Sequence, residues 1–159
     1  MDAAEPKPSL ESAALRIVNS YMGWSAGAGL IPLPGIDLAA ISGVQLKMVH
    51  ALSKLYGLPF SRDAAKSVIG ALVGGGSTYI LAAPVGSIVK AVPVVGLIAG
   101  ALTQPALAAA TTYALGKVFI QHFETGGNLL NFNADDLRRY YSEQLAVAQK
   151  TGPGAAKAD

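Results

Sequence analysis

Three long stretches without a formal charge limit what this chain can fold into more than any other feature. Residues 17–36 hold 20 uncharged positions, residues 67–89 hold 23 and residues 91–116 hold 26. About 20 mainly apolar residues in a helix cross the ~30 Å hydrocarbon core of a bilayer, so each stretch is long enough to span one. The stretches therefore predict helices that are buried on all sides, by lipid or by protein.

The composition of these stretches differs from that of a simple membrane anchor, which is rich in Leu, Ile and Phe. Gly, Ser and Thr are frequent, and five prolines occur: Pro32, Pro34, Pro84, Pro93 and Pro105. Small residues let helix backbones approach closely, and proline at membrane depth requires protein or a cavity to cover the freed backbone groups. Deep membrane association is the first expectation. A soluble bundle whose central helices are buried all round is the alternative.

The composition of the whole chain excludes several classes of protein. With 159 residues, 52% hydrophobic and 14% charged, the chain suits one ordered domain. A net charge of +2 and 7% aromatic residues provide neither the basic excess nor the stacking surfaces of a nucleic-acid binder. The polar, acidic start lacks the basic and apolar regions of a signal peptide, so we expect the cytoplasmic side of a membrane or a cytoplasmic assembly.

Capping signals, glycines and prolines predict an all-α fold, a compact bundle of about five to six helices built around two apolar hairpins with Pro/Gly elbows. The elbow at residues 31–36 resembles residues 92–97, at an offset of 61 positions. A single helical domain is expected over residues 9–150, with flexible tails at 1–8 and 151–159. Helices are expected over residues 10–30, 34–56, from 62 into the glycines at 74–76, weakly over 77–91, over 93–124 with a kink at Pro105, and from 134 onward.

The expected caps and inward faces follow from the same patterns. Ser9, Ser61 and Asn133 are the expected N-caps, and Gly57 and Gly126 the expected helix stops. The inward face of the second helix is expected to hold Leu38, Ile41, Val44, Met48, Leu52 and Leu55. That of the last helix is expected to hold Leu137, Tyr140, Tyr141, Leu145 and Ala148.

Motifs that carry enzymatic chemistry are incomplete in this sequence. The glycines at 70–76 have Gly76 where a phosphate-binding loop needs lysine. His50 and His122 lack a second ligand at helical spacing, and Asp135 and Asp136 suit the start of a helix better than acid–base work. We expect no catalytic residue, no cofactor and no metal site, and a protein that is not an enzyme.

Candidate contact residues remain. Three GxxxG pairs predict close helix contacts, within one chain or between subunits: Gly23/Gly27, Gly70/Gly74 and Gly96/Gly100. Trp24 and the elbow residues Pro32, Pro34 and Pro93 complete the candidates for membrane contact or self-association. Lys47, His50 and Lys54 share one polar helix face, which would meet anionic headgroups or be simply solvated.

Several of these segments resemble a known family. The elbow that leads to Asp37, Gln45 and Met48, and the Thr112–Gly116 segment before a Gly-Gly turn, resemble the GTPase-associated domain of unknown function typified by YcjF-like proteins. The resemblance covers roughly residues 10–145. It implies membrane association and a partner GTPase, which would act in trans because this chain has no phosphate-binding loop; it implies no catalytic residue.

The sequence therefore leads to one function hypothesis with two alternatives. The first is a non-enzymatic, membrane-associated helical protein that self-assembles in a structural or scaffold role, as a homo-oligomer that contacts membrane lipid and no nucleic acid. The alternatives are an adaptor or effector of a small GTPase, and a pore or lipid-binding assembly.

Overall fold

The computed structural model describes residues 9–28, 36–82 and 103–155 and confirms the all-α prediction. These residues form five helices and no strand. The helices are α1 (Leu10–Ala28), α2 (Ile36–Leu55), α3 (Arg62–Ala82), α5 (Thr103–Glu124) and α6 (Ala134–Ala155).

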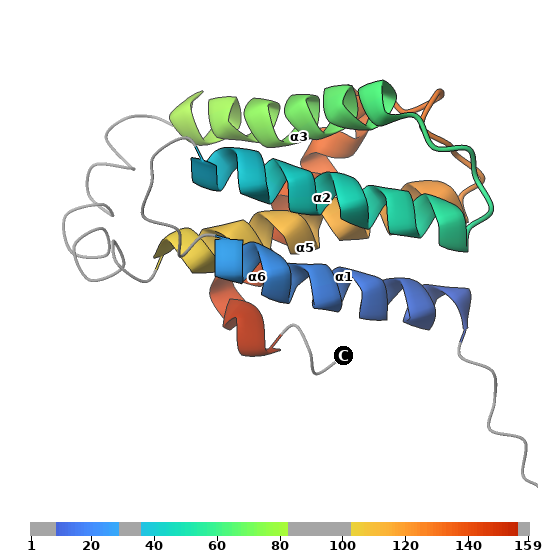
Figure 1. The fold of residues 1–159 in the computed structure, drawn as a ribbon. Coiled ribbons are helices and arrows are strands. Elements are labelled where there is room, and N and C mark those ends of the chain that lie inside the picture. The colour runs from blue at the N-terminus through green and yellow to red at the C-terminus, as the bar shows by residue number, and fades with distance from the viewer. Residues whose placement is uncertain (1–8, 29–35, 83–102, 156–159) are drawn as a thin grey trace, which may run out of the picture.

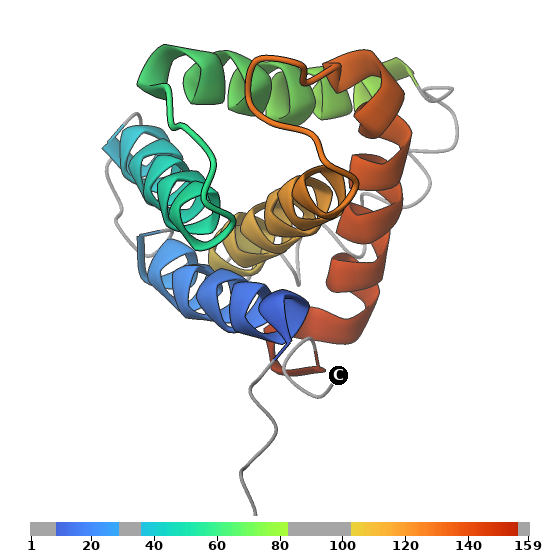
Figure 2. The same cartoon turned by 90° about the vertical axis from the view of Figure 1, so that its right-hand side faces the viewer.

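The helices form one bundle with α5 at its centre (Figure 1). Helix α5 packs against α1, α6 and α2. Helix α3 crosses the bundle at an angle and contacts α2 and α6 (Figure 2). Helix α6 lies across one side of the bundle, against α5 and α3 (Figure 2). As a result α5 is covered on several sides, as expected of a helix that carries no charge over residues 103–116.

The predicted caps are present at three helix starts. The backbone N–H of Ser12 donates to Ser9 Oγ (3.2 Å), that of Ala64 to Ser61 Oγ (3.3 Å) and that of Asp135 to Asn133 Oδ1 (3.1 Å). Each side chain satisfies an N–H group that has no partner within its helix. Gly57 (φ 67°) and Gly126 (φ 87°) follow the ends of α2 and α5 in the left-handed conformation that glycine adopts without strain.

Two expected helix limits and one expected kink are wrong. Helix α3 continues through the glycines at 74–76 to Ala82, because glycine weakens a helix by only about 1 kcal/mol per residue. Pro105 is the third residue of α5, in the first turn, where its missing N–H removes no helical hydrogen bond and no kink follows. Helix α6 reaches Ala155 and so includes five residues of the expected tail, since extending an existing helix costs little.

The buried face of α2 is rotated from the predicted one. Met48 and Leu52 are buried as expected, but Gln45, Val49 and Ser53 join them, while Ile41, Val44 and Leu55 are only half-buried. The expectation counted apolar side chains alone, whereas the fold gives Gln45 a buried hydrogen-bond partner. In α6, Tyr141, Leu145 and Ala148 are buried and Leu137 and Tyr140 half-buried, as predicted.

The two predicted elbows fall almost entirely outside the described residues. Residues 31–35 and 92–97 belong to the connections that join α1 to α2 and α3 to α5. Helices α1 and α2, on either side of the first connection, contact each other, as expected of a hairpin. The second hairpin, expected between residues 77–91 and the helix that begins at Pro93, stays a prediction. The further helical piece expected beyond residue 82 also lies outside the described part.

Candidate functional site

The uncharged parts of four helices meet at one end of the bundle. They are residues 17–28 of α1, 38–46 of α2, 67–82 of α3 and 103–116 of α5. Helices α1 and α3 finish at this end and α2 and α5 begin there, on the left in Figure 1. We call these four segments the charge-free end. Around them the sequence places two charged residues, Asp37 at the second position of α2 and Lys90, which lies outside the described residues.

The described segments of the charge-free end are shorter than a bilayer. At 1.5 Å per residue they are about 14 to 24 Å long, against ~30 Å for a hydrocarbon core and half of that for one leaflet. Of the three uncharged stretches, the structure describes residues 17–28 and 36, 67–82, and 103–116. Among the described residues, no helix is both long and apolar enough to cross a membrane.

Buried polar side chains connect three helices within this end. The hydroxyls of Ser25 on α1 and Thr112 on α5 are 2.7 Å apart, and Gln45 Nε2 on α2 donates to Thr112 Oγ1 at 3.3 Å. All three residues are almost fully buried. A buried polar group without a partner costs about 1–3 kcal/mol, so these bonds fix how α1, α2 and α5 are positioned along one another.

The close helix contact of this end is made by Gly116, outside the predicted GxxxG pairs. A Cβ atom at Gly116 would lie 2.5 Å from Val18 Cγ2 and 2.7 Å from Val18 Cγ1, so α1 and α5 approach closely only because position 116 has no side chain. Gly23, Gly27 and Gly70 are exposed, and a Cβ there would meet nothing within 4 Å. The prediction of contacts within the chain is wrong at these three positions, and contact between subunits stays a prediction.

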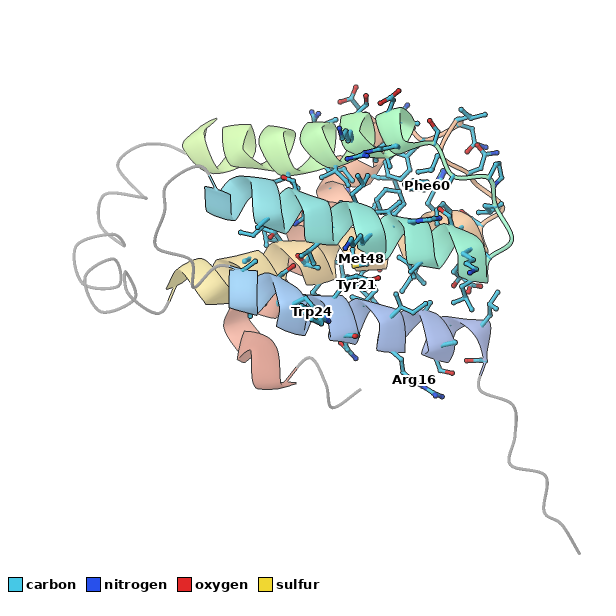
Figure 3. The ribbon with its side chains drawn as sticks, viewed as in Figure 1. Arg16, Tyr21, Trp24, Met48 and Phe60 are labelled. Atoms are coloured by element: carbon cyan, nitrogen blue, oxygen red, sulfur yellow. The ribbon has the colours of Figure 1, made fainter. Side chains whose placement is uncertain are left out.

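The exposed glycines of α1 lie along a shallow groove beside Trp24. The groove has a volume of about 560 Å³. Its lining residues are Ser20, Gly23, Trp24, Gly27, Ala28 and Val44. Trp24 is 70% exposed, and Figure 3 shows it on α1, well away from Arg16. Trp24 is therefore not part of the core.

The basic residues of α2 lie on its exposed face, as predicted. Lys47, His50 and Lys54 are all exposed, and the His50 ring stacks on that of Phe60, with 4.4 Å between centroids. None of these three side chains forms an ion pair in the part of the chain that the structure describes. Lys47 lies directly after the uncharged segment 38–46, whereas Lys54 lies seven residues further along α2, away from the charge-free end.

The rest of the bundle has a different chemistry. On α6, ion pairs join the half-buried Arg138 to the exposed Asp135, and Arg139 to Glu143, each at 3.1 Å, beside a hollow of about 470 Å³. Tyr56 Oη donates to Glu124 Oε1 at 2.5 Å. Burial, followed by this bond and the Glu124 charge, raises the pKa of Tyr56. The described side chains include no group of three or more His, Asp or Glu residues placed to hold a metal ion.

Some predicted site residues lie beyond what the structure describes, and others were missed. Pro32, Pro34, Pro93, Gly96 and Gly100 fall outside the described residues, and Gly74 is described only as part of α3. Gly116 was missed as a contact because it belongs to no GxxxG pair. Three cations that border the charge-free end, Arg16, Lys66 and Lys117, are visible in the sequence as limits of the uncharged stretches. The fourth, Lys47, is one of the predicted headgroup contacts.

Two comparisons with known proteins identify relatives. The family described as Domain of unknown function (DUF697) matches residues 4–150. Magnetosome membrane protein 22 of Magnetospirillum gryphiswaldense is 39% identical over 153 residues, which cover 92% of this chain and 78% of that protein. No solved structure matches. The chain therefore belongs to the DUF697 family, as the resemblance of its elbow and its Thr112–Gly116 segment predicted.

Proposed function

We propose that this protein is a membrane-associated helical module that docks through its charge-free end and self-assembles in a structural or scaffold role. The observation that carries the proposal is the meeting of four uncharged helix segments at one end of the bundle, beside an exposed tryptophan. A similar protein that is named as a magnetosome membrane protein supports the membrane part of the proposal.

The physical basis is the cost of bringing charge into lipid. A charged side chain at the centre of a bilayer costs about 2.5–3.5 kcal/mol or more, so an end without charged side chains enters lipid at a lower cost than the rest of the bundle. Trp24 exposes a large aromatic ring at this end, which lipid or a second copy would cover. The groove beside it, lined by Gly23 and Gly27, gives a second copy a surface on which helix backbones can approach closely.

Vesicle flotation tests the membrane part. The wild-type chain is expected to float with lipid vesicles, and the variant Ser20→Glu/Ser42→Glu, which adds two charges at exposed positions of the charge-free end, is expected to lose at least tenfold in bound fraction. The matched control, Gln121→Glu/Ala146→Glu, adds the same charge at exposed positions elsewhere and should float like the wild type. Equal loss in both variants, or no flotation of the wild type, would refute the proposal.

Sedimentation tests the assembly part. The protein prepared without detergent should form a discrete particle larger than one 16.2 kDa chain, or be recovered only from membranes with detergent. A monomer in plain buffer that ignores vesicles contradicts both parts. An adaptor role for a small GTPase remains a separate prediction, which pull-down with GTP-loaded and GDP-loaded partners would test.

A further inference from the structure

Each segment of the charge-free end stops at a positive charge. Going away from that end, the first charged residue is Arg16 on α1, Lys66 on α3 and Lys117 on α5. On α2, Asp37 comes first and Lys47 is the next charged residue. We call these four side chains the cation belt. No carboxylate takes one of these four positions, although the chain has 10 acidic and 12 basic residues.

Contacts between helices place the belt at one level of the bundle. Gly116 faces Val18, so Lys117 and Arg16 lie one and two residues further from the charge-free end, about 2 Å apart along the axis. The bond between Gln45 and Thr112 sets α2 against α5.

The same reasoning adds the other two cations. Going away from the charge-free end, Lys47 lies two residues beyond Gln45, and Lys117 lies five residues beyond Thr112. Because Gln45 and Thr112 are bonded, Lys47 and Lys117 are offset by about 5 Å along the axis of the bundle. The stacking of His50 on Phe60 holds the start of α3 beside α2, one turn beyond Lys47. Lys66 lies about one turn into α3, back toward the charge-free end, and so near the level of Lys47.

The belt is free to meet an external anion. Arg16, Lys47 and Lys66 are exposed and Lys117 is half-buried. None of them forms an ion pair with a described residue, whereas Arg138 and Arg139 on α6 both do. Lysine and arginine side chains extend their charges to the level of lipid phosphates while their aliphatic stems stay in the apolar region.

We infer that the cation belt lies at the phosphate level of one leaflet that contains anionic phospholipid, and that the charge-free end enters the acyl chains of that leaflet alone. This inference rests on the proposed membrane function and adds the lipid class and the depth. The described segments, about 14 to 24 Å long, match one leaflet with its interface and fall short of the ~30 Å core.

Trp24 reports this depth without any substitution, because it is the sole tryptophan of the chain. It lies eight residues from Arg16 toward the charge-free end, about 12 Å along α1. With the belt at the phosphates, the indole would enter the acyl region. We therefore expect a blue shift of its emission on vesicles, strong quenching by lipids brominated along the acyl chain and weak quenching by acrylamide.

Lipid charge and belt charge are tested together by flotation on neutral phosphatidylcholine vesicles and on vesicles that also contain phosphatidylglycerol. Each cation near an anionic surface contributes about fivefold in partitioning, so Arg16→Gln/Lys47→Gln/Lys66→Gln should lose about 100-fold on anionic vesicles. The control Lys54→Gln/Arg62→Gln/Arg139→Gln removes the same charge from exposed positions further from the charge-free end and should lose less than tenfold. Circular dichroism of each variant checks the fold.

The outcomes separate this inference from the proposed function. Equal binding to neutral and anionic vesicles, equal loss in both triple variants, or a bound Trp24 that acrylamide still quenches would overturn the inference and leave membrane docking in place. Binding to neither vesicle would overturn both. If the protein then sedimented as a large particle without detergent, a second copy would cover the charge-free end instead of lipid.

Discussion

The two ends of this bundle are held together by different kinds of side chain. At the charge-free end, α1, α2 and α5 meet through Gly116 and through the hydrogen bonds of Ser25, Gln45 and Thr112. At the opposite end, which we call the charged end, the aromatic rings of Phe119, Phe123 and Phe132 fill the space between the helices. Phe119 lies 5.6 Å from Phe123 and 5.1 Å from Phe132, measured between ring centroids.

This difference suits the proposed function, in which one end of the bundle lies in water and the other contacts lipid. Large rings bury apolar area and keep the charged end stable in water, where the hydrophobic effect acts. Small residues and paired hydroxyls hold helices by close approach, which also works where lipid surrounds them. All four phenylalanines of the chain, including Phe60, lie outside the charge-free segments. Removing volume should therefore destabilise the end that holds these rings, and adding volume should destabilise the charge-free end.

Removing volume from the charged end should have the largest effect on stability. Phe119→Ala empties a fully buried position between two rings and should lower the free energy of unfolding by about 3–5 kcal/mol, as measured by urea denaturation. Phe60→Ala, at a half-buried position, should cost less than half as much. Similar losses in the two variants would mean that the Phe119 cluster is not a core.

Adding volume to the charge-free end should come next. Gly116→Leu forces a side chain into Val18, so α1 and α5 must separate, and the free energy of unfolding should fall by about 3 kcal/mol. Gly70→Leu is the control, because position 70 is exposed and a better helix former there should stabilise by about 0.5 kcal/mol. The close approach of α1 and α5 would be wrong if Gly116→Leu were neutral.

Removing one buried hydroxyl should have a smaller effect. Thr112→Val keeps the shape of the side chain but leaves Ser25 Oγ and Gln45 Nε2 without this partner, which should cost about 1–3 kcal/mol. Thr111→Val removes a half-buried hydroxyl that donates to the Ala108 carbonyl and accepts a longer bond (3.5 Å) from Gln45 Nε2, and it should cost less. A double-mutant cycle of Ser25→Ala with Thr112→Val should show coupling; additive losses would argue against the bond.

The smallest effect belongs to Tyr56, whose hydrogen bond to Glu124 joins the charged ends of α2 and α5. Tyr56→Phe should cost about 1 kcal/mol at pH 8. The pKa of Tyr56 is raised in the folded state, so its contribution is fully present below the unfolded pKa of about 10 and is lost as the pH rises through the folded pKa.

Urea denaturation at pH 8 and at pH 11 measures this dependence. The difference in stability between the wild type and Tyr56→Phe should shrink at the higher pH. Burial also raises the pKa of Tyr141, so some alkaline loss will persist in the variant. A difference that stayed constant would show that Tyr56 ionises equally in the folded and unfolded chain.

Local signals in the sequence are sufficient for much of the helical structure. The caps at Ser9, Ser61 and Asn133 and the stops at Gly57 and Gly126 depend on residues within one turn, and the structure confirms them. The limits of α3 and α6 could not be predicted in this way. Glycine and proline only bias a helix, and the outcome depends on what the rest of the chain packs against it.

The sequence by itself determined where charge is absent, that the fold is all-α and which faces carry Lys47, His50 and Lys54, because these depend on composition and periodicity along one segment. Only the tertiary structure decided that four uncharged segments meet at one end, that Gly116 rather than Gly23 or Gly27 contacts a neighbouring helix, and that Gln45 is buried. These features depend on how residues far apart in the chain are aligned along neighbouring helices, and no local pattern encodes that alignment.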